Sequence, residues 1–250
     1  MAASLVQASA VATGAGPVAS ANVTLNGVLA TNTIIVKWLA QRSGAITSVS
    51  DGSAYTINGS IANLASGYQF AAYSRQIGSN GNYTITITLP ATDAFSYVFW
   101  AEEWSGLTAT PADGFAAQDQ AAVATTTDAV TSGNITPSQD GALITGFTVD
   151  RTQNATTTPG TGFTGVTHSG LPGNNRVEYL VQATAAAIAA TFTAQFSGDN
   201  WSTCVSAWKV KPPGPKITLQ PLPQKAAIGG TATINYAATV SAGGGSVTAQ

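Results

Sequence analysis

Apolar and polar residues alternate over many short segments of the chain, and turn-forming residues separate these segments roughly every ten positions. Tyr83, Ile85 and Ile87 alternate with threonines, and residues 95–100 repeat the pattern with aromatic side chains. Successive side chains of a strand point to opposite faces of a sheet, so a period of two predicts β-strands. Many such strands with frequent turn signals predict an all-β protein built as an antiparallel sandwich.

Further segments are predicted as strands on the same pattern. They are residues 4–12, 22–25, 33–41, 46–50, 54–58, 68–74, 142–149, 176–182, 189–196 and 204–210. The alanine-rich residues 183–190 favour a helix by propensity, but they present no apolar face at the helical period. We therefore expect a turn that leads into a strand at that place.

A proline-rich segment divides the chain. Residues 211–215 read Lys-Pro-Pro-Gly-Pro, and proline fixes φ and removes backbone donors, which prevents strand pairing and leaves a stiff connector. The predicted domains are a sandwich over residues 1–211, a linker over residues 212–216 and a further module over residues 217–250. That last segment holds too few strand-like pieces to close a core alone, so we expect only the beginning of a module.

Charged residues are sparse. Nine Lys and Arg and eleven Asp and Glu give a net charge of −2, and they make up 8% of the chain against about 25% in an ordinary domain. Without a basic stretch, phosphate neutralisation cannot drive binding, so we expect no nucleic-acid partner. A single Cys forms no internal disulfide, and a single His removes most metal sites and most acid–base chemistry. We expect no enzyme, no cofactor and no metal site.

The N-terminal residues and the hydrophobicity profile bear on location. Residues 1–27 contain no Lys or Arg, and their apolar residues are scattered, so we expect no signal peptide. Lys37 interrupts the most apolar stretch, residues 33–40, and we expect no membrane span and no membrane partner. An extracellular type of composition without an export signal is expected of a virion protein assembled in the host cytoplasm and released by lysis. The alternative is a protein of the bacterial cell surface or a secreted one.

One family resemblance covers residues 1–211. Residues 45–57, 70–73 and 83–87, and then Ala-Glu-Glu-Trp-Ser-Gly at residues 101–106, follow one another in this order. Residues 136–144, the loop 160–164, Trp201 and the closing residues 207–210 continue the series. The chain resembles a β-sandwich module of phage virion proteins and bacterial surface proteins.

A second resemblance lies beyond the prolines. Residues 217–224 and 227–236 look like the first strands of a bacterial or phage immunoglobulin-like domain, without its core Trp and later strands. This resemblance implies a display or adhesion module set beside a capsid, tail or cell-surface protein. Either the natural chain continues past Gln250 or another chain completes the sheet.

Several carboxylates deserve a structural interpretation. Glu102 and Glu103 are the only adjacent pair, but neighbours on a strand face opposite sides, whereas a glycosidase needs two carboxylates at one bond. We expect one of them to face solvent and the other to pair with Lys or Arg. Turn residues Asp51, Asp113, Asp140 and Asp199 are expected to cap their turns, with a calcium site as the alternative.

The five tryptophans are the remaining candidates for binding. Burial in the core accounts for most of them, because a large apolar surface is stabilised by packing. Trp104 and Trp201 lie at strand ends beside Gly106 and Asn200. We predict that these two contact a ligand or a partner protein, and no catalytic, cofactor-binding or metal-ligating residue is predicted.

The first functional hypothesis is a bacteriophage virion structural protein. It would be a capsid decoration (cement) protein with a jelly-roll-like sandwich and a displayed immunoglobulin-like module. It would form a homo-oligomer and bind the major capsid protein or tail proteins, because polar, uncharged faces favour coverage by neighbours. The alternatives are a tail or fibre adhesin that binds cell-surface glycan, a carbohydrate-binding module of a bacterial surface protein, and a sandwich-fold glycoside hydrolase with two convergent carboxylates.

Overall fold

The structure is a computed structural model, and the part of the chain that it describes consists of antiparallel strands joined by turns and loops. It describes residues 2–15, 19–41, 48–61, 64, 67–89, 96–120, 128–150, 157–172, 175–194, 201–212, 217–221 and 236–240. These residues include no helix, so the predicted all-β, antiparallel class is confirmed. Residues 2–210 form one compact unit and Lys211 begins another.

The first half of the large unit is a sandwich of two sheets. One sheet has the order β1–β9–β4–β7–β6, and β2 also pairs with β9. Its strands are β1 (Ser4–Ala8), β2 (Ala12–Ala15), β4 (Thr33–Gln41), β6 (Thr56–Ile61), β7 (Tyr68–Gln76) and β9 (Ser96–Ser105). The other sheet has the order β3–β8–β5, with β3 (Ser20–Val28), β5 (Ser48–Ser50) and β8 (Gly81–Thr88). The core between the two sheets includes Trp38, Phe99 and Ile85.

The second half repeats this plan. A sheet of order β10–β17–β12–β15–β14 faces a sheet of order β11–β16–β13. The strands of the larger sheet are β10 (Leu107–Gln120), β12 (Leu143–Asp150), β14 (Thr164–Val166), β15 (Asn175–Val181) and β17 (Trp201–Val210). The smaller sheet has β11 (Asp128–Thr131), β13 (Thr157–Pro159) and β16 (Thr191–Ala194). Ile144, Phe192 and Val205 belong to the core of this second sandwich.

The two sandwiches have the same topology, strand for strand. If β1 and β2 together correspond to β10, then β3 to β9 correspond in chain order to β11 to β17, and both sheet orders coincide. In jelly rolls the first strand likewise lies beside the last, so each half is jelly-roll-like. The sequence pattern predicts the strands of one sandwich; the structure divides them between two equivalent ones.

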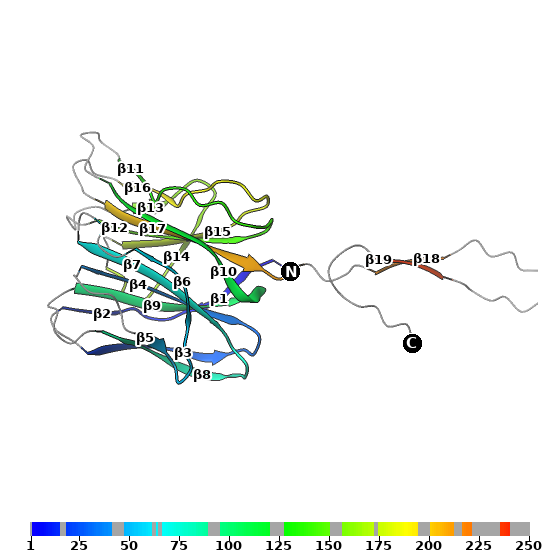
Figure 1. Ribbon diagram of the computed structural model, residues 1–250, viewed down its shortest axis with the longest axis horizontal. Helices are drawn as coiled ribbons and strands as arrows, with labels where there is room; N and C mark the ends of the chain where they lie inside the picture. Colours follow the sequence, from blue (N-terminus) through cyan, green and yellow to red (C-terminus); the bar gives the residue numbers. More distant parts are fainter. Residues whose placement is uncertain are drawn as a thin grey trace, which may run out of the picture. The chain divides into compact units, whose positions relative to one another are not determined.

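The larger sheets of the two sandwiches pack face to face. Figure 1 shows the resulting order of layers, from β11, β16 and β13 to β3, β5 and β8. Trp100 and Phe70 from one sheet and Phe147 from the other belong to the shared core, as do Trp104 and Trp208. Both faces of these central sheets are covered, which explains why nearly every residue of β4, β9 and β17 is buried.

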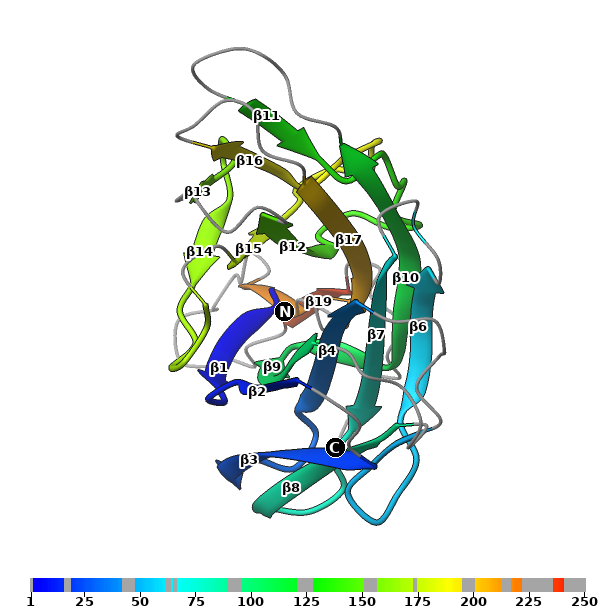
Figure 2. The same cartoon turned by 90° about the vertical axis from the view of Figure 1, so that its left-hand side faces the viewer.

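Contacts at the sheet edges join the sandwiches further. β6 lies along β10 (Figure 2), and the Asn58 carboxamide donates to the carbonyls of Gly114 (3.1 Å) and Ala207 (3.2 Å). At the opposite edge the Val11 N–H donates to the Ser169 carbonyl (2.9 Å), just after β14. Because β14 corresponds to β6 and β1–β2 to β10, the two edge contacts are equivalent, as in a two-fold dimer.

A single glycine connects the two sandwiches. β9 ends at Ser105 and β10 begins at Leu107, and Gly106 between them has φ +81°, a conformation that favours glycine. A Cβ at this position would lie 2.5 Å from the Ala2 carbonyl oxygen. The connection therefore requires glycine both for its backbone conformation and for space.

In the second unit the described residues form one antiparallel pair of strands. β18 (Ile217–Pro221) pairs antiparallel with β19 (Tyr236–Val240). The likeness to an immunoglobulin-like domain stays a prediction.

Most predicted strands are present. Residues 183–190 form a bend and a bridge before β16, not a helix, so the expectation of a turn leading into a strand is confirmed. Four strands of the large unit, β10, β11, β13 and β14, overlap none of the predicted strands. Among the described residues no helix has the length and apolarity that crossing a bilayer requires.

Candidate functional site

Trp104 and Trp201 lie in the core, and each has an exposed fraction of 0%. The Trp104 indole N–H donates to Glu102 (2.9 Å), and the ring meets Tyr179 edge-on at 5.1 Å between centroids. Trp201 belongs to the core of the second sandwich, and its Nε1 has no hydrogen-bond partner. Neither indole presents a face to solvent, so a surface ligand could not stack on either one.

The turn residues Asp51 and Asp140 hold nearby backbone and side chains, whereas Asp113 lies on strand β10 and not in the expected turn. Asp51 accepts from the Ser53 N–H (3.2 Å) and pairs with Arg75 (2.9 Å), while Asp140 accepts from the Ala185 N–H (2.7 Å). Asp199 lies outside the described residues. Within the described ranges no three His, Cys, Asp or Glu side chains gather as a metal site would require.

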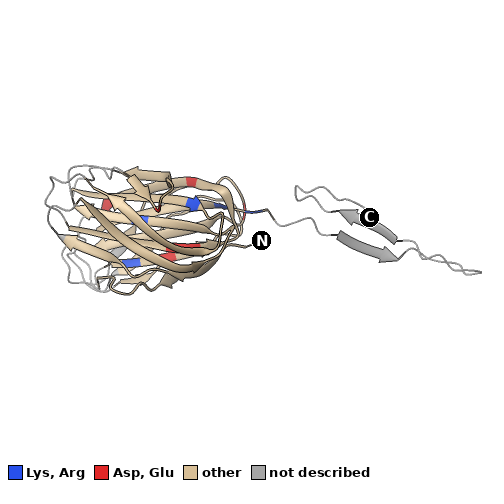
Figure 3. Ribbon diagram, turned by 90° about the horizontal axis from the view of Figure 1, so that it is seen from below, with Lys and Arg blue, Asp and Glu red and all other residues tan. Residues whose placement is uncertain are grey.

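Charged residues are few and scattered along the ribbons of the sandwiches (Figure 3). Lys37, Glu102 and His168 form one buried cluster between the two sandwiches. Glu102 of β9 is 1% exposed and accepts from the Lys37 ammonium, with Nζ at 3.2 and 3.1 Å from the two carboxylate oxygens. Trp100 and Trp104 donate their indole N–H groups at 3.0 and 2.9 Å, and His168 Nε2 lies at 3.2 Å. One carboxylate therefore has four side-chain partners from both sandwiches.

His168 links this cluster to the backbone just after β1. Its Nδ1 lies 3.0 Å from the Ser9 carbonyl oxygen, while its Nε2 faces Glu102. Both partners are hydrogen-bond acceptors, so a protonated ring nitrogen on either side of the ring has an acceptor within reach. Burial raises the pKa of the Glu102 carboxyl, but Lys37 and His168 outweigh burial and hold the pKa well below its usual range. Glu102 is thus a structural anion rather than a proton donor.

The expectation that one of the two adjacent glutamates faces solvent is wrong, because Glu103 is also buried. It points to the face opposite Glu102, as the strand period predicts, but it is 0% exposed instead of facing solvent. Its carboxylate accepts from the Asn32 carboxamide (2.6 Å), the Leu29 N–H (2.9 Å) and the Gln7 carboxamide (2.6 Å). These donors come from the β3–β4 turn and β1, so Glu103 fixes the turn to the sheet. The predicted pairing with a cation is confirmed for Glu102 alone.

Glu178 is a buried carboxylate of a different kind. It lies on β15 and accepts backbone N–H groups from Gly160 (2.8 Å) and Thr191 (3.1 Å). Burial raises its pKa to about 8, although the two N–H donors act in the opposite direction. Its role is to hold the β13–β14 turn against β16.

Cys204 is a free thiol in the shared core, on β17. Burial raises its pKa to about 12, so the thiol stays protonated at neutral pH. A protonated, buried thiol is a poor nucleophile.

A cavity of about 280 Å³ opens between the two central sheets. One wall comes from the first sandwich, with Leu39 at the end of β4 and residues 96–98 at the start of β9. The other wall comes from the second sandwich, with Val149 at the end of β12 and Asn175 at the start of β15. A smaller cavity of about 130 Å³ reaches Asn175 from the side of His168.

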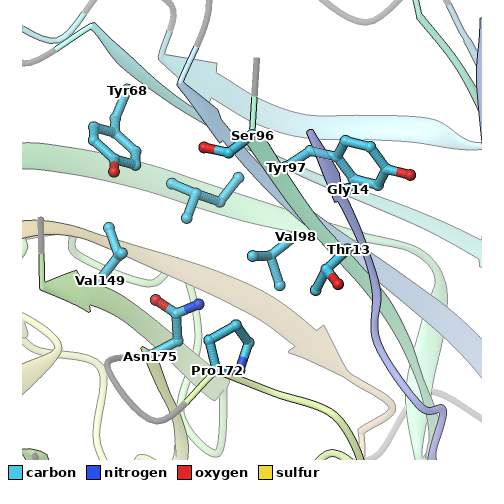
Figure 4. A pocket seen from close by; sticks show the side chains of 10 residues that line it. Thr13, Gly14, Tyr68, Ser96, Tyr97, Val98, Val149, Pro172 and Asn175 are labelled. Carbon is cyan, nitrogen blue, oxygen red and sulfur yellow. The ribbon is translucent and has the colours of Figure 1, made fainter. Parts of the chain in front are cut away.

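The described residues that line the larger cavity are both polar and apolar, and none of them carries a formal charge. Figure 4 shows the Asn175 carboxamide and the Tyr68 hydroxyl pointing into the space beside Val98 and Val149. The Asn175 Oδ1 is buried and accepts no hydrogen bond. Sequence reasoning did not single out Asn175; the signal available was a polar residue at the start of an apolar strand.

No protein-family model, no curated protein and no solved structure matches the chain.

Proposed function

We propose that the protein is a structural component of a bacteriophage virion, a decoration protein that acts through contacts with other virion proteins. The resemblance of residues 1–211 to a virion sandwich module motivates this proposal. The observation that carries it is the uncharged outer face of the β3–β8–β5 sheet.

That outer face is an array of hydroxyl and amide side chains. Cross-strand register aligns them in rows, which are Ser20, Thr88 and Ser48, then Asn22, Thr86 and Ser50, then Thr24 and Thr84. These side chains are exposed or half-buried, and Thr24 and Thr84 bond to each other through their hydroxyls at 3.1 Å. Covering hydroxyl and amide groups with protein costs less than covering charges, so this face suits a protein neighbour.

The interior supports the same role. Glu102 and Glu103 hold parts of the fold together and are buried, and the shared core joins both sandwiches into a stiff body. A stiff body with an uncharged face is suited to binding by surface complementarity. Residues beyond the prolines would then be displayed from that body.

The test is mass spectrometry of purified particles of the phage that encodes the chain. We expect the protein at a stoichiometry comparable with the capsid or tail proteins, and its position among them distinguishes decoration from host recognition. Absence from the particles contradicts the proposal.

A pair of variants tests the face itself. Thr84→Glu places a charge on the exposed face of β8, and we expect a particle content reduced at least tenfold. Thr193→Glu makes the same change at an exposed position of β16, the strand that corresponds to β8, and should leave incorporation unchanged. Equal incorporation of both variants would exclude this face as the contact.

A further inference from the structure

Asn175 presents an unsatisfied acceptor at the cavity between the two sandwiches. The residue is 3% exposed, and its Oδ1 has no hydrogen-bond partner. A buried carbonyl oxygen without a donor is costly, and such groups are rare in folded proteins. A bound ligand that donates a hydrogen bond would remove this cost.

The fold itself does not require an asparagine at this position. We align Trp104 of β9 with Trp208 of β17, so their cross-strand partners Thr33 and Leu143 become equivalent. Leu39 and Val149, six residues further along β4 and β12, are then equivalent as well. Across the next strand, Leu39 pairs with Phe70 and Val149 pairs with Asn175. The first sandwich therefore has a core phenylalanine where the second has a polar side chain with an unpaired oxygen.

The other lining residues define the kind of ligand. Among the described residues no Lys, Arg, Asp or Glu lines the cavity. These residues do not compensate a charged group, so a charged ligand would be desolvated at a cost. Leu39, Val98 and Val149 provide an apolar surface, while Ser96 and Thr13 provide hydroxyls. A fitting ligand is neutral and combines hydroxyl donors with an apolar face.

We propose that this cavity binds one ring of a neutral saccharide. A pyranose ring has hydroxyl donors for Asn175 Oδ1 and a C–H face for the aliphatic and tyrosine side chains. A volume of about 280 Å³ gives room for a single small ring rather than for a long chain. The site does not depend on the virion role and would add recognition of a glycan to it.

Saturation-transfer NMR with the full chain tests the proposal. The probes are methyl α-glucopyranoside, methyl β-galactopyranoside and N-acetylglucosamine, with glucuronate as the charged counterpart. We expect at least one neutral sugar to bind with a Kd on the order of millimolar, and glucuronate to bind at least tenfold more weakly. Binding of none of the three neutral sugars overturns the proposal.

Matched variants locate the site. Asn175→Phe introduces the residue of the first sandwich, and Val149→Phe fills the cavity from the same wall without removing the acceptor; each should weaken sugar binding at least tenfold. Asn22→Phe makes the same exchange on the exposed face of β3 and should leave binding unchanged. Asn175→Ala keeps the cavity open and should also weaken binding about tenfold, the effect of one lost hydrogen bond to a buried acceptor. Unchanged binding by folded Val149→Phe and Asn175→Ala proteins, or loss of binding by Asn22→Phe, overturns the assignment.

Discussion

At the scale of single residues, the buried carboxylates are the most consequential groups. Glu102 neutralises Lys37 at 3.1 Å inside the shared core. We predict that Glu102→Gln lowers the free energy of unfolding by about 3–5 kcal/mol, because it leaves the ammonium buried without its counter-charge. Urea unfolding at pH 7 measures this as a lower midpoint at an unchanged slope.

The second sandwich provides the control for that variant. Register places Phe147 at the position of Lys37 and Ser206 at the position of Glu102. The double variant Lys37→Phe, Glu102→Ser removes both charges together and should lose less stability than Glu102→Gln. An equal or greater loss in the double variant would contradict the idea that the unpaired charge is the main cost.

Glu178 should make stability depend on pH in the opposite sense to Glu102. Burial raises the pKa of Glu178 from 4.5 to about 8, so between these values the unfolded chain releases a proton that the folded chain keeps. The contribution of Glu178 to the free energy of unfolding is fully present below pH 4.5 and is lost as the pH rises to 8. At about 1.4 kcal/mol per pKa unit, the loss is at most about 5 kcal/mol. The lowered pKa of Glu102 instead gives stability that is present above pH 4.5 and lost below it.

The variant Glu178→Gln separates the two effects. It removes the titration of Glu178, so urea unfolding at pH 5, 6.5 and 8 should show a flatter profile than the natural chain. The loss of stability below pH 4.5 should persist, because Glu102 is unchanged. Identical profiles of the two proteins between pH 5 and 8 would show that Glu178 does not cause the decline.

At the scale of elements, the connection between the sandwiches depends on Gly106. We predict that Gly106→Ala lowers the free energy of unfolding by about 1–3 kcal/mol through backbone strain alone. The steric overlap adds a further loss, because the new Cβ would lie 2.5 Å from the Ala2 carbonyl oxygen. Gly162 has a similar φ, +84°, but open space around its Cβ. Gly162→Ala should therefore cost less than Gly106→Ala in thermal unfolding, and equal losses would exclude the steric contribution.

The elements also show what sequence patterns predict and what they miss. β8 alternates isoleucine with threonine and faces solvent on one side, so its period is visible in the sequence. β10 was not predicted because Pro111, Asp113 and Gly114 interrupt it, and its register with β17 shifts at these positions. Pairing with β17, a tertiary interaction, decides its conformation rather than local propensity.

The duplication escapes the sequence for a related reason. Equivalent positions of the central sheets hold chemically different residues, such as Lys37 and Phe147, or Trp100 and Cys204. The burial of both faces removes the alternation that would mark a strand's inner side. The cavity could not be predicted from the sequence either, because it forms only where Asn175 and Val149 of one sheet face Leu39 of the other.

At the scale of the whole molecule, the sandwiches share a core and should unfold together. The central sheets bury their facing sides only against each other, so separation would expose Trp100, Phe147 and the buried charges of Glu102 and Lys37. Exposing so much apolar surface costs more than a marginally stable sandwich could offset. We therefore expect residues 2–210 to unfold in one transition.

Two matched core variants test this cooperativity. Ile85→Ala affects only the core of the first sandwich, and Ile144→Ala only that of the second; each should lower stability by about 2–5 kcal/mol. In native-state hydrogen exchange, each variant should reduce the protection of slowly exchanging amides in β8 and in β16 by the same amount, because global unfolding exposes both. Loss of protection confined to the mutated sandwich would show instead that the two halves open independently and that the shared core is weaker than its burial indicates.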